Sequence, residues 1–268
     1  MRLSRAGAPL LVLGLVVLGV RPASPGITEQ IVVTFQQVAQ GFQDAFPPIE
    51  GTVIAVNGEQ VSIEFKERPK IGRGTELRLI RRGAAFRHPL TGVFLGRYEE
   101  LVGHAQVVEV RESVATGRLI PLPEAPAVQV EDIARITRGR LRVAVTPLLD
   151  LTGSRLDTKR LPYLLAAALE RTGRFAPADP RVVSESMDQA RVRTVDLFAT
   201  PALAVRLSQR LEVDGWVIPL LVEIQGSTVV DATWVSAITG TPLFARRAAL
   251  APAPPQIEQR FPWEPPAR

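Results

Sequence analysis

Hydrophobic positions recur at helical spacing over residues 27–46 (ITEQIVVTFQQVAQGFQDAF), as at Ile31, Phe35 and Phe42. Glutamines fill the other side of this pattern. A proline pair that begins at Pro47 ends it, because proline lacks an amide donor and disfavours the helical region before it. The pattern predicts an amphipathic helix. Its stripe carries few charges and is expected to pack within the chain, with contact to a partner protein as the alternative.

From residue 51 the pattern changes to alternation, which is typical of strands with one buried face. Residues 51–56 and 60–66 flank Asn57-Gly58, a pair that favours a tight hairpin because both residue types accept positive φ. Further strands are expected at 76–81, 93–98, 104–111 and 113–119. Short strands without a helix between them predict a small all-β barrel or sandwich over about 47–120.

Beyond a proline-rich linker at 121–139, the pattern alternates between strand and helix. The expected elements are a strand at 141–145, helices near 158–172, 181–190 and 201–212, and strands at 216–225, 228–238 and 243–250. Asp179 and Thr200 each precede a proline and are expected to cap the second and third of these helices. Pro219 falls inside a strand, which predicts an edge position or a bulge. The order predicts an α/β layer with a mixed sheet over 140–250.

The chain is therefore expected to have two domains of α+β class: a helix with a small β-barrel or sandwich, and then the α/β layer. The tail at 251–268 has six prolines and no periodicity, and it is expected to be disordered. Phe261 and Trp263 in this tail form a candidate docking motif.

Residues 1–24 have the layout of a secretory signal. Arg2 and Arg5 precede an uncharged apolar run at 8–20, which as a helix would span only about 20 Å, too short for a membrane core of about 30 Å. We therefore expect export to the periplasm. An uncleaved tether in the inner membrane is the alternative, because Arg21 and Pro22 fall where a cleavage site wants small residues.

Composition and charge exclude some classes of function. The chain has no cysteine, which excludes disulfides, thiol nucleophiles and a lipid-modified cysteine. Removal of Arg2, Arg5 and Arg21 with the signal would lower the formal net charge from +5 to +2. Global charge therefore indicates no nucleic-acid partner.

Two stretches resemble known envelope families. The motifs GTVI from Gly51, GRGTEL from Gly72 and HPLTG from His88 resemble the C-terminal domain of flagellar assembly protein T, in which an aspartate usually stands where this chain has His88. The motifs VAV from Val143, DLTG from Asp150 and TGRF from Thr172 are similar to the TolB amino-terminal and CsgG-like α/β domain.

The resemblance covers about 200 residues, at about 47–120 and 140–250, through short motifs of turn glycines and strand starts. It implies a periplasmic or outer-membrane-associated accessory or assembly protein. The barrel comes first here, which reverses the order in flagellar assembly protein T, so a flagellar role does not carry over.

No catalytic motif is present in the sequence. His88 and His104 are the only histidines, and no zinc motif, serine elbow or phosphate loop occurs. His88 is expected to be a turn residue and His104 to lie near a strand start. We therefore expect no catalytic residue, no cofactor and no metal site.

Residues 68–87 carry seven basic side chains against a single acid, Glu76. The candidates for binding an anion or a partner are Arg73, Arg78, Arg81, Arg82 and Arg87. The planar guanidinium suits phosphate and carboxylate groups, so anionic lipid, lipopolysaccharide or an acidic protein could bind there. The alternative is a solvated face whose charges pair with glutamates elsewhere in the chain.

These observations favour a non-catalytic envelope binding or assembly accessory protein, serving a flagellar, secretion or related apparatus and binding other envelope proteins. A periplasmic module for a small anionic ligand is the first alternative. A hydrolase of an envelope polymer is the second.

Overall fold

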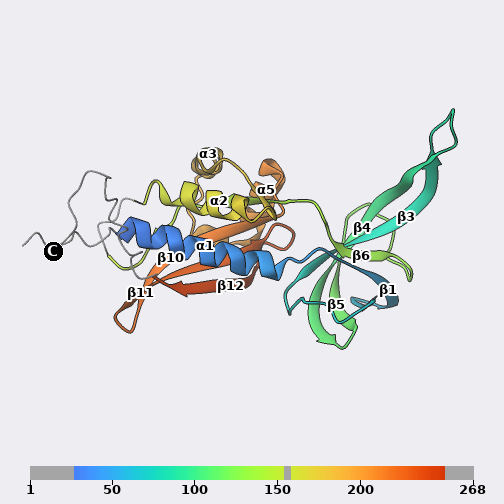
Figure 1. Cartoon of the computed structure of the whole chain (residues 1–268), viewed down its shortest axis with the longest axis horizontal. Coiled ribbons are helices and arrows are strands. Elements are labelled where there is room, and N and C mark those ends of the chain that lie inside the picture. Colours follow the sequence, from blue (N-terminus) through green and yellow to red (C-terminus); the bar gives the residue numbers. More distant parts are fainter. Residues whose placement is uncertain (1–26, 154–157, 251–268) are drawn as a thin grey trace, which may run out of the picture.

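The computed structural model describes residues 27–153 and 158–250, which form two sheets with helices around the second (Figure 1). The first sheet is a closed antiparallel barrel with the strand order β1-β2-β5-β4-β3-β6, called the ring below. Its strands are β1 (Ile49–Asn57), β2 (Gln60–Phe65), β3 (Glu76–Arg87), β4 (Phe94–Arg111), β5 (Val114–Pro121) and β6 (Ile133–Ile136). Alternate residues fill its interior, among them Val61, Ile63, Leu77, Leu79, Ala105 and Val107.

The ring confirms the alternating pattern and corrects two details. The hairpin of β1 and β2 pairs Asn57 with Gln60, and Gly58 adopts a φ of +59° in the turn. The strands expected at 93–98 and 104–111 are one strand, β4, so His104 lies inside it. The expected linker at 121–139 contains β6, which pairs with both β1 and β3 and thereby closes the ring. The ring therefore extends past the predicted boundary at residue 120.

The second sheet is mixed, as predicted, with the order β12-β11-β10-β7-β9 and β8 paired to β10. Its strands are β7 (Leu141–Val145), β8 (Leu149–Asp150), β9 (Phe175–Pro177), β10 (Gly215–Ile224), β11 (Ser227–Ser236) and β12 (Pro242–Ala249). The strands β9, β7 and β10 run parallel, whereas β10, β11 and β12 are antiparallel.

Pro219 does not lie at an edge or a bulge. It pairs with Ala232 in an uninterrupted register on β11, and the other side of β10 is covered by β7 and β8. The β7 pairing ends at Val217 and the β8 pairing begins at Leu220. The proline therefore stands where β10 has no partner on that side, and its missing amide donor is tolerated in a central strand.

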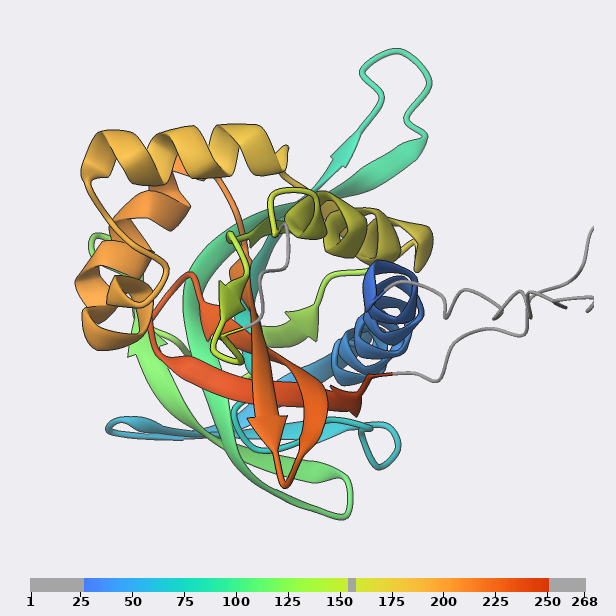
Figure 2. The ribbon, with the colours of Figure 1, turned by 90° about the vertical axis from the view of Figure 1, so that its left-hand side faces the viewer.

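Helices cover both faces of the second sheet (Figure 2). They are α1 (Ile27–Ala45), α2 (Leu161–Arg171), α3 (Pro180–Ala190), α4 (Asp196–Ala199) and α5 (Pro201–Leu211). Buried residues of α1 and α2 share a core with Val217 and Trp234, whereas those of α3 to α5 pack against Trp216 and Ile218. The predicted cap at Asp179 accepts a hydrogen bond from the amide of Arg181 at 2.8 Å. Thr200 makes no such bond.

The helix α1 precedes the ring but packs on the second sheet. Its buried stripe lies against α2, β11 and β12, where the centroids of the phenyl groups of Phe42 and Phe244 are 5.8 Å apart. The prediction that the stripe packs within the chain is confirmed. Along the chain, α1 on the second sheet is thus followed by the six strands of the ring, and these are followed by the strands of the second sheet. One cluster of buried residues runs from the interior of the ring to the α1 and α2 side of the second sheet.

Arg174 forms hydrogen bonds with both chain segments that connect the ring to the second sheet. This side chain is 7% exposed and lies between α2 and β9. Its guanidinium donates to the carbonyl oxygens of Phe46 at 2.7 Å, Thr137 at 2.8 Å and Gly139 at 2.5 Å. Phe46 follows α1, and the other two residues follow β6. One planar cation therefore satisfies three carbonyls on the two connecting segments.

Within residues 27–153 and 158–250, no helix is long and apolar enough to cross a membrane. The predicted signal at 1–24 and the predicted docking motif of Phe261 and Trp263 lie outside the described residues.

Candidate functional site

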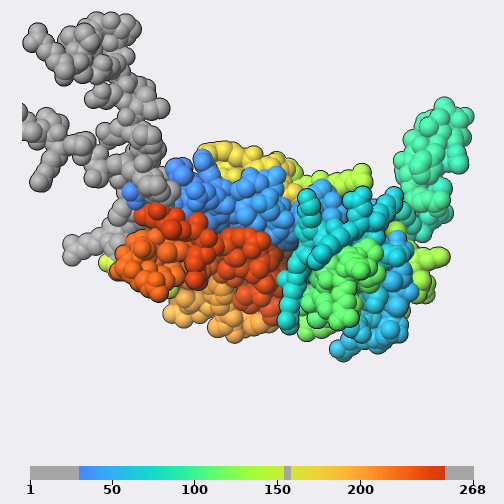
Figure 3. Space-filling model, turned by 60° about the horizontal axis from the view of Figure 1, so that its bottom comes forward, coloured from blue at the N-terminus to red at the C-terminus, as the bar shows by residue number. Residues whose placement is uncertain are grey.

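The hairpin of β3 and β4 continues well beyond the ring and projects from the body of the molecule (Figures 1 and 3). Pairing of β3 with β6 ends at Ile80, and pairing of β4 with β5 begins at Gly103. The two strands pair only with each other past these points. We call residues 83–98 the arm. No other helix or strand of residues 27–153 and 158–250 lies against the faces of the arm, and its side chains are exposed on both faces.

Large apolar side chains are exposed on the arm. They are Phe86, Leu90, Val93, Phe94, Leu95 and Tyr98, and the exposed fraction reaches 91% at Leu90 and 66% at Tyr98. Single exposed apolar residues are ordinary on protein surfaces, but a group of six on one projection is typical of an interaction site. The exposed apolar character is thus concentrated on the element that extends furthest from the ring.

The tip of the arm is internally ordered. The Nδ1 atom of His88 accepts hydrogen bonds from the amides of Leu90 and Thr91 at 3.3 and 3.2 Å. Arg87 donates to the carbonyl oxygen of Gly92 at 3.1 Å, and its guanidinium lies 5.9 Å from the ring centroid of Phe94. His88 is therefore a turn residue, as expected, and performs the amide-accepting role that an aspartate carboxylate would perform at this position.

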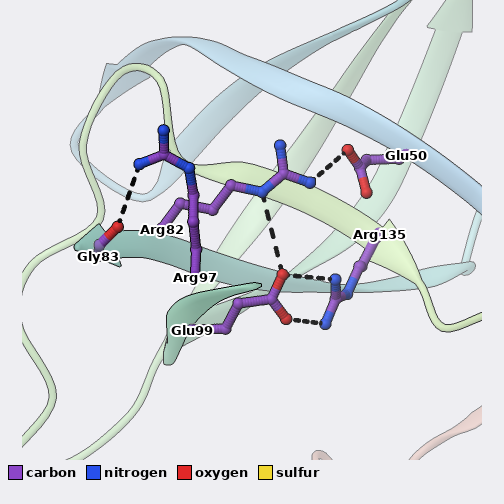
Figure 4. Close-up of polar contacts among 6 residues, drawn as sticks. All are labelled: Glu50, Arg82, Gly83, Arg97, Glu99 and Arg135. Atoms are coloured by element: carbon purple, nitrogen blue, oxygen red, sulfur yellow. Dashed lines mark hydrogen bonds and ion pairs between the residues drawn. The ribbon is translucent and has the colours of Figure 1, made fainter. Parts of the chain in front are cut away.

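Ion pairs hold the base of the arm (Figure 4). Arg82 donates to Glu50 of β1 at 2.7 Å and lies 3.9 Å from Glu99 of β4. Arg135 of β6 donates to both carboxylate oxygens of Glu99. Arg97 donates to the carbonyl oxygen of Gly83 at 3.4 Å. Four strands of the ring, β1, β3, β4 and β6, are thus tied together where the arm leaves it.

The five arginines predicted as one binding patch lie in five different settings. Arg81 forms a two-pronged bond to the buried carboxylate of Asp132, at 3.0 and 2.8 Å, and also reaches the carbonyl oxygen of Ala127. Arg78 faces the second sheet and pairs with Asp214 at 2.6 Å. Arg82 is at the base of the arm and Arg87 is at its tip.

Arg73 lies apart from the other four, in the loop before β3, beside a shallow cavity shared with Arg118 and Thr241. Carboxylates therefore partner Arg78, Arg81 and Arg82, as the alternative interpretation of the cluster requires. Of the predicted residues, the arm itself contains only Arg87.

The apolar residues of the arm were not predicted as a candidate site, although the sequence there has an unusual pattern. Residues 93–98 read VFLGRY, with apolar side chains on both faces of the strand instead of alternate positions. A strand of the ring buries one face only, so this two-sided apolar run departs from the alternation of the other strands.

The described part of the chain contains no group of three histidine, aspartate or glutamate side chains that could hold a metal ion. Two titratable side chains, those of Glu76 and His104, lie in a cleft between the ring and the second sheet. Burial raises the pKa of Glu76 to about 7, and burial lowers the pKa of His104 to about 4. His104 is therefore neutral at neutral pH.

No protein-family model matches the chain, and no curated protein matches it. The resemblance to flagellar assembly protein T and to TolB and CsgG therefore stays a prediction.

Solved structures match about two fifths of the chain. The C-terminal domain of LpoB from Escherichia coli is 14% identical, with a TM-score of 0.35, over 41% of this chain and 82% of that one. Lipoprotein GNA1162 from Neisseria meningitidis is 22% identical, with a TM-score of 0.35, over 41% and 80%. A PelC dodecamer from Paraburkholderia phytofirmans is 14% identical, with a TM-score of 0.28, over 43% and 74%. These likenesses are distant and assign no function to the chain.

Proposed function

We propose that this chain is a non-catalytic binding or assembly protein of the bacterial envelope, periplasmic or associated with the outer membrane, and that its arm binds another envelope protein. The observation that carries the proposal is the exposed apolar surface of residues 83–98 on a hairpin that no other described helix or strand covers. The envelope location rests on the pattern of residues 1–24.

The construction of the arm supports a role in binding. Its base is tied by Arg82, Glu99 and Arg135, and its tip by His88 and Arg87. A hairpin that is ordered at both ends loses little conformational freedom when it binds, which favours affinity. Exposed aromatic side chains are also common anchors in protein interfaces, because they bury a large area with few rotatable bonds.

The charges on the arm indicate what the partner presents. Residues 83–98 contain Arg87 and Arg97 and no acidic residue. The complementary surface is an apolar groove on a protein, with acidic groups at its rim. The predicted patch is a poorer site for a small anionic ligand, because Arg78, Arg81 and Arg82 already pair with carboxylates.

Affinity capture from solubilised envelopes of the native bacterium tests this function. The test variant combines Leu90→Ser, Phe94→Ser and Leu95→Ser on the arm. The matched control combines Leu151→Ser and Tyr163→Ser, which also replace exposed apolar side chains but lie by the second sheet. We expect the wild type and the control to capture the same protein, and the arm variant to lose at least about tenfold of it, since buried anchors often contribute more than 1.4 kcal/mol.

Capture of the same proteins by the arm variant would contradict the proposal. Sedimentation with anionic lipid vesicles provides the second readout. If the arm substitutions abolish sedimentation with vesicles and leave protein capture unchanged, the arm binds lipid, and the proposed protein partner is wrong.

A further inference from the structure

The ring and the second sheet enclose a cleft of about 250 Å³ at their junction. The outer face of the ring contributes polar side chains to it, because Leu77 and its alternate neighbours point into the ring and the residues between them point out. The ring side of the cleft is formed by Glu76, Arg78, His104 and Arg135. The opposite side includes Phe46, Asp214, Trp234 and Ile238.

Glu76 is a partly buried carboxylate that forms no ion pair with a described residue. Its two oxygens accept hydrogen bonds from the hydroxyl of Ser236 at 2.8 and 2.9 Å. No arginine or lysine of the described residues forms an ion pair with it. Burial raises its pKa to about 7, against smaller opposing effects of Ser236 and the charge of Arg118. A positive group in the cleft would offset the cost of ionising this carboxylate.

The arginines of the cleft are already neutralised. Arg78 pairs with Asp214 at 2.6 Å, and Arg135 pairs with Glu99. His104, which is 7% exposed, has an Nδ1 atom without a hydrogen-bond partner in the described part of the chain, and burial lowers its pKa to about 4. The imidazole is therefore uncharged at neutral pH and does not repel a cation. Among the described acids that line the cleft, Glu76 is the one without an ion pair, and Arg118 on β5 acts on it from beyond ion-pair distance.

Aromatic rings complete the wall. The centroids of Phe46 and Trp234 are 4.4 Å apart, and both residues line the cleft. Phe46 and Trp234 are only 5% and 2% exposed, so they offer the cleft an apolar wall and not an open aromatic face. The volume of the cleft is that of roughly eight water molecules at ~30 Å³ each, which suits a small molecule and not a peptide.

We propose that this cleft binds a small organic cation, with an ammonium group directed at the carboxylate of Glu76 and an apolar body against Phe46 and Trp234. The site differs from the arm, so it goes beyond the proposed function and does not depend on the partner of the arm. Since the site spans the ring and the second sheet, an occupant contacts both.

Titration of the full chain with choline, followed by nuclear magnetic resonance, tests the proposal. The neutral isostere 3,3-dimethylbutan-1-ol has the same shape without the charge and serves as the ligand control. We expect choline to shift the indole signal of Trp234 and the amides of residues around Glu76, and the isostere to bind at least about tenfold more weakly, because it lacks the charged contact to Glu76.

Two variants locate the site. Glu76→Gln keeps the hydrogen bond to Ser236 and removes the charge, so we expect choline binding to weaken at least about tenfold. Glu64→Gln, at an exposed position on β2, is the matched control and should bind like the wild type. Ala237→Phe fills the cleft while Glu76 stays, and it should abolish binding even if the first variant folds poorly.

Equal binding of choline and its isostere, unchanged binding by Glu76→Gln and Ala237→Phe, or the absence of choline-induced shifts near Trp234 would each overturn the proposal.

Discussion

Glu76 couples the stability of the fold to pH. Its pKa rises from the unfolded value of 4.5 to about 7 in the fold, so the folded state holds a proton that the unfolded chain releases between these values. The stabilisation is fully present below pH 4.5 and is lost as the pH rises to 7. His104 acts in the opposite sense: its contribution is present above pH 6.5 and is lost as the pH falls to about 4.

Glu76→Gln is expected to remove the first of these dependences. The difference in the free energy of unfolding between the wild type and this variant should change by about 3 kcal/mol from pH 4.5 to pH 7. Urea unfolding at a series of pH values measures it, with Glu64→Gln as the control. A constant difference between wild type and Glu76→Gln would show that this carboxyl titrates normally.

Arg174 is the second residue with a predictable effect. Arg174→Ala removes the donor to three carbonyl oxygens on the two connecting segments, and we expect a loss of about 3 kcal/mol or more in the free energy of unfolding. Arg174→Lys should recover only a part, because an ammonium lacks the planar fork. Arg171→Ala, at an exposed site on α2, is the control. If Arg174→Ala lowers the free energy of unfolding no more than Arg171→Ala does, the hydrogen bonds of Arg174 do not hold the two connecting segments.

At the residue scale, the sequence could indicate which side chains are charged but not what they contact. The run of arginines at 68–87 was visible, whereas the partners of Arg81 and Arg78 lie 51 and 136 residues away along the chain. Such pairs depend on the closure of the ring and on its position against the second sheet. Local sequence patterns predict neither the closure of the ring nor its position against the second sheet.

The elements were predicted where one face is buried and the other is solvated. The strand β2 and the helix stripe of α1 follow this rule. The rule fails for β6, a four-residue strand (IARI) that is too short to show alternation. It also fails for the arm, whose strands extend past the core. The partner of α1 was likewise hidden, because a stripe does not identify the surface that it covers.

The helix α1 offers a test at the element scale. Phe42→Ala should lower the free energy of unfolding by about 3–5 kcal/mol, because the side chain is fully buried among Trp234 and Phe244 of the second sheet. Gln37→Ala, on the exposed side of the same helix, should change it by less than about 0.5 kcal/mol. Similar small effects at both positions would place α1 away from the second sheet.

Shortening the arm should separate binding from folding. Replacement of residues 84–97 by Asn-Gly leaves the pairings of β3 with β6 and of β4 with β5 intact. The thermal midpoint is therefore expected to stay within about 4 °C of the wild-type value, which corresponds to about 1 kcal/mol or less. A collapse of the fold on shortening would mean that the arm is structural, and calorimetry distinguishes the two results.

On the scale of the whole molecule, the fold combines a continuous core with one uncovered projection. The core runs from the ring to the second sheet, and Arg174 fastens the two segments that join them. A binding event at the arm or in the cleft therefore acts on a connected body. The arm is the place where the molecule presents most apolar surface to its surroundings, and the account depends on that surface being used.

Photo-crosslinking in the native cell tests this most directly. A photoreactive phenylalanine analogue at Leu90, at the tip of the arm, is compared with the same analogue at Tyr163, an exposed position on α2. We predict that Leu90 forms a discrete adduct with one envelope protein and that Tyr163 does not. If Leu90 forms no protein adduct, or forms the same adducts as Tyr163, the arm does not bind a protein partner and the central claim is wrong.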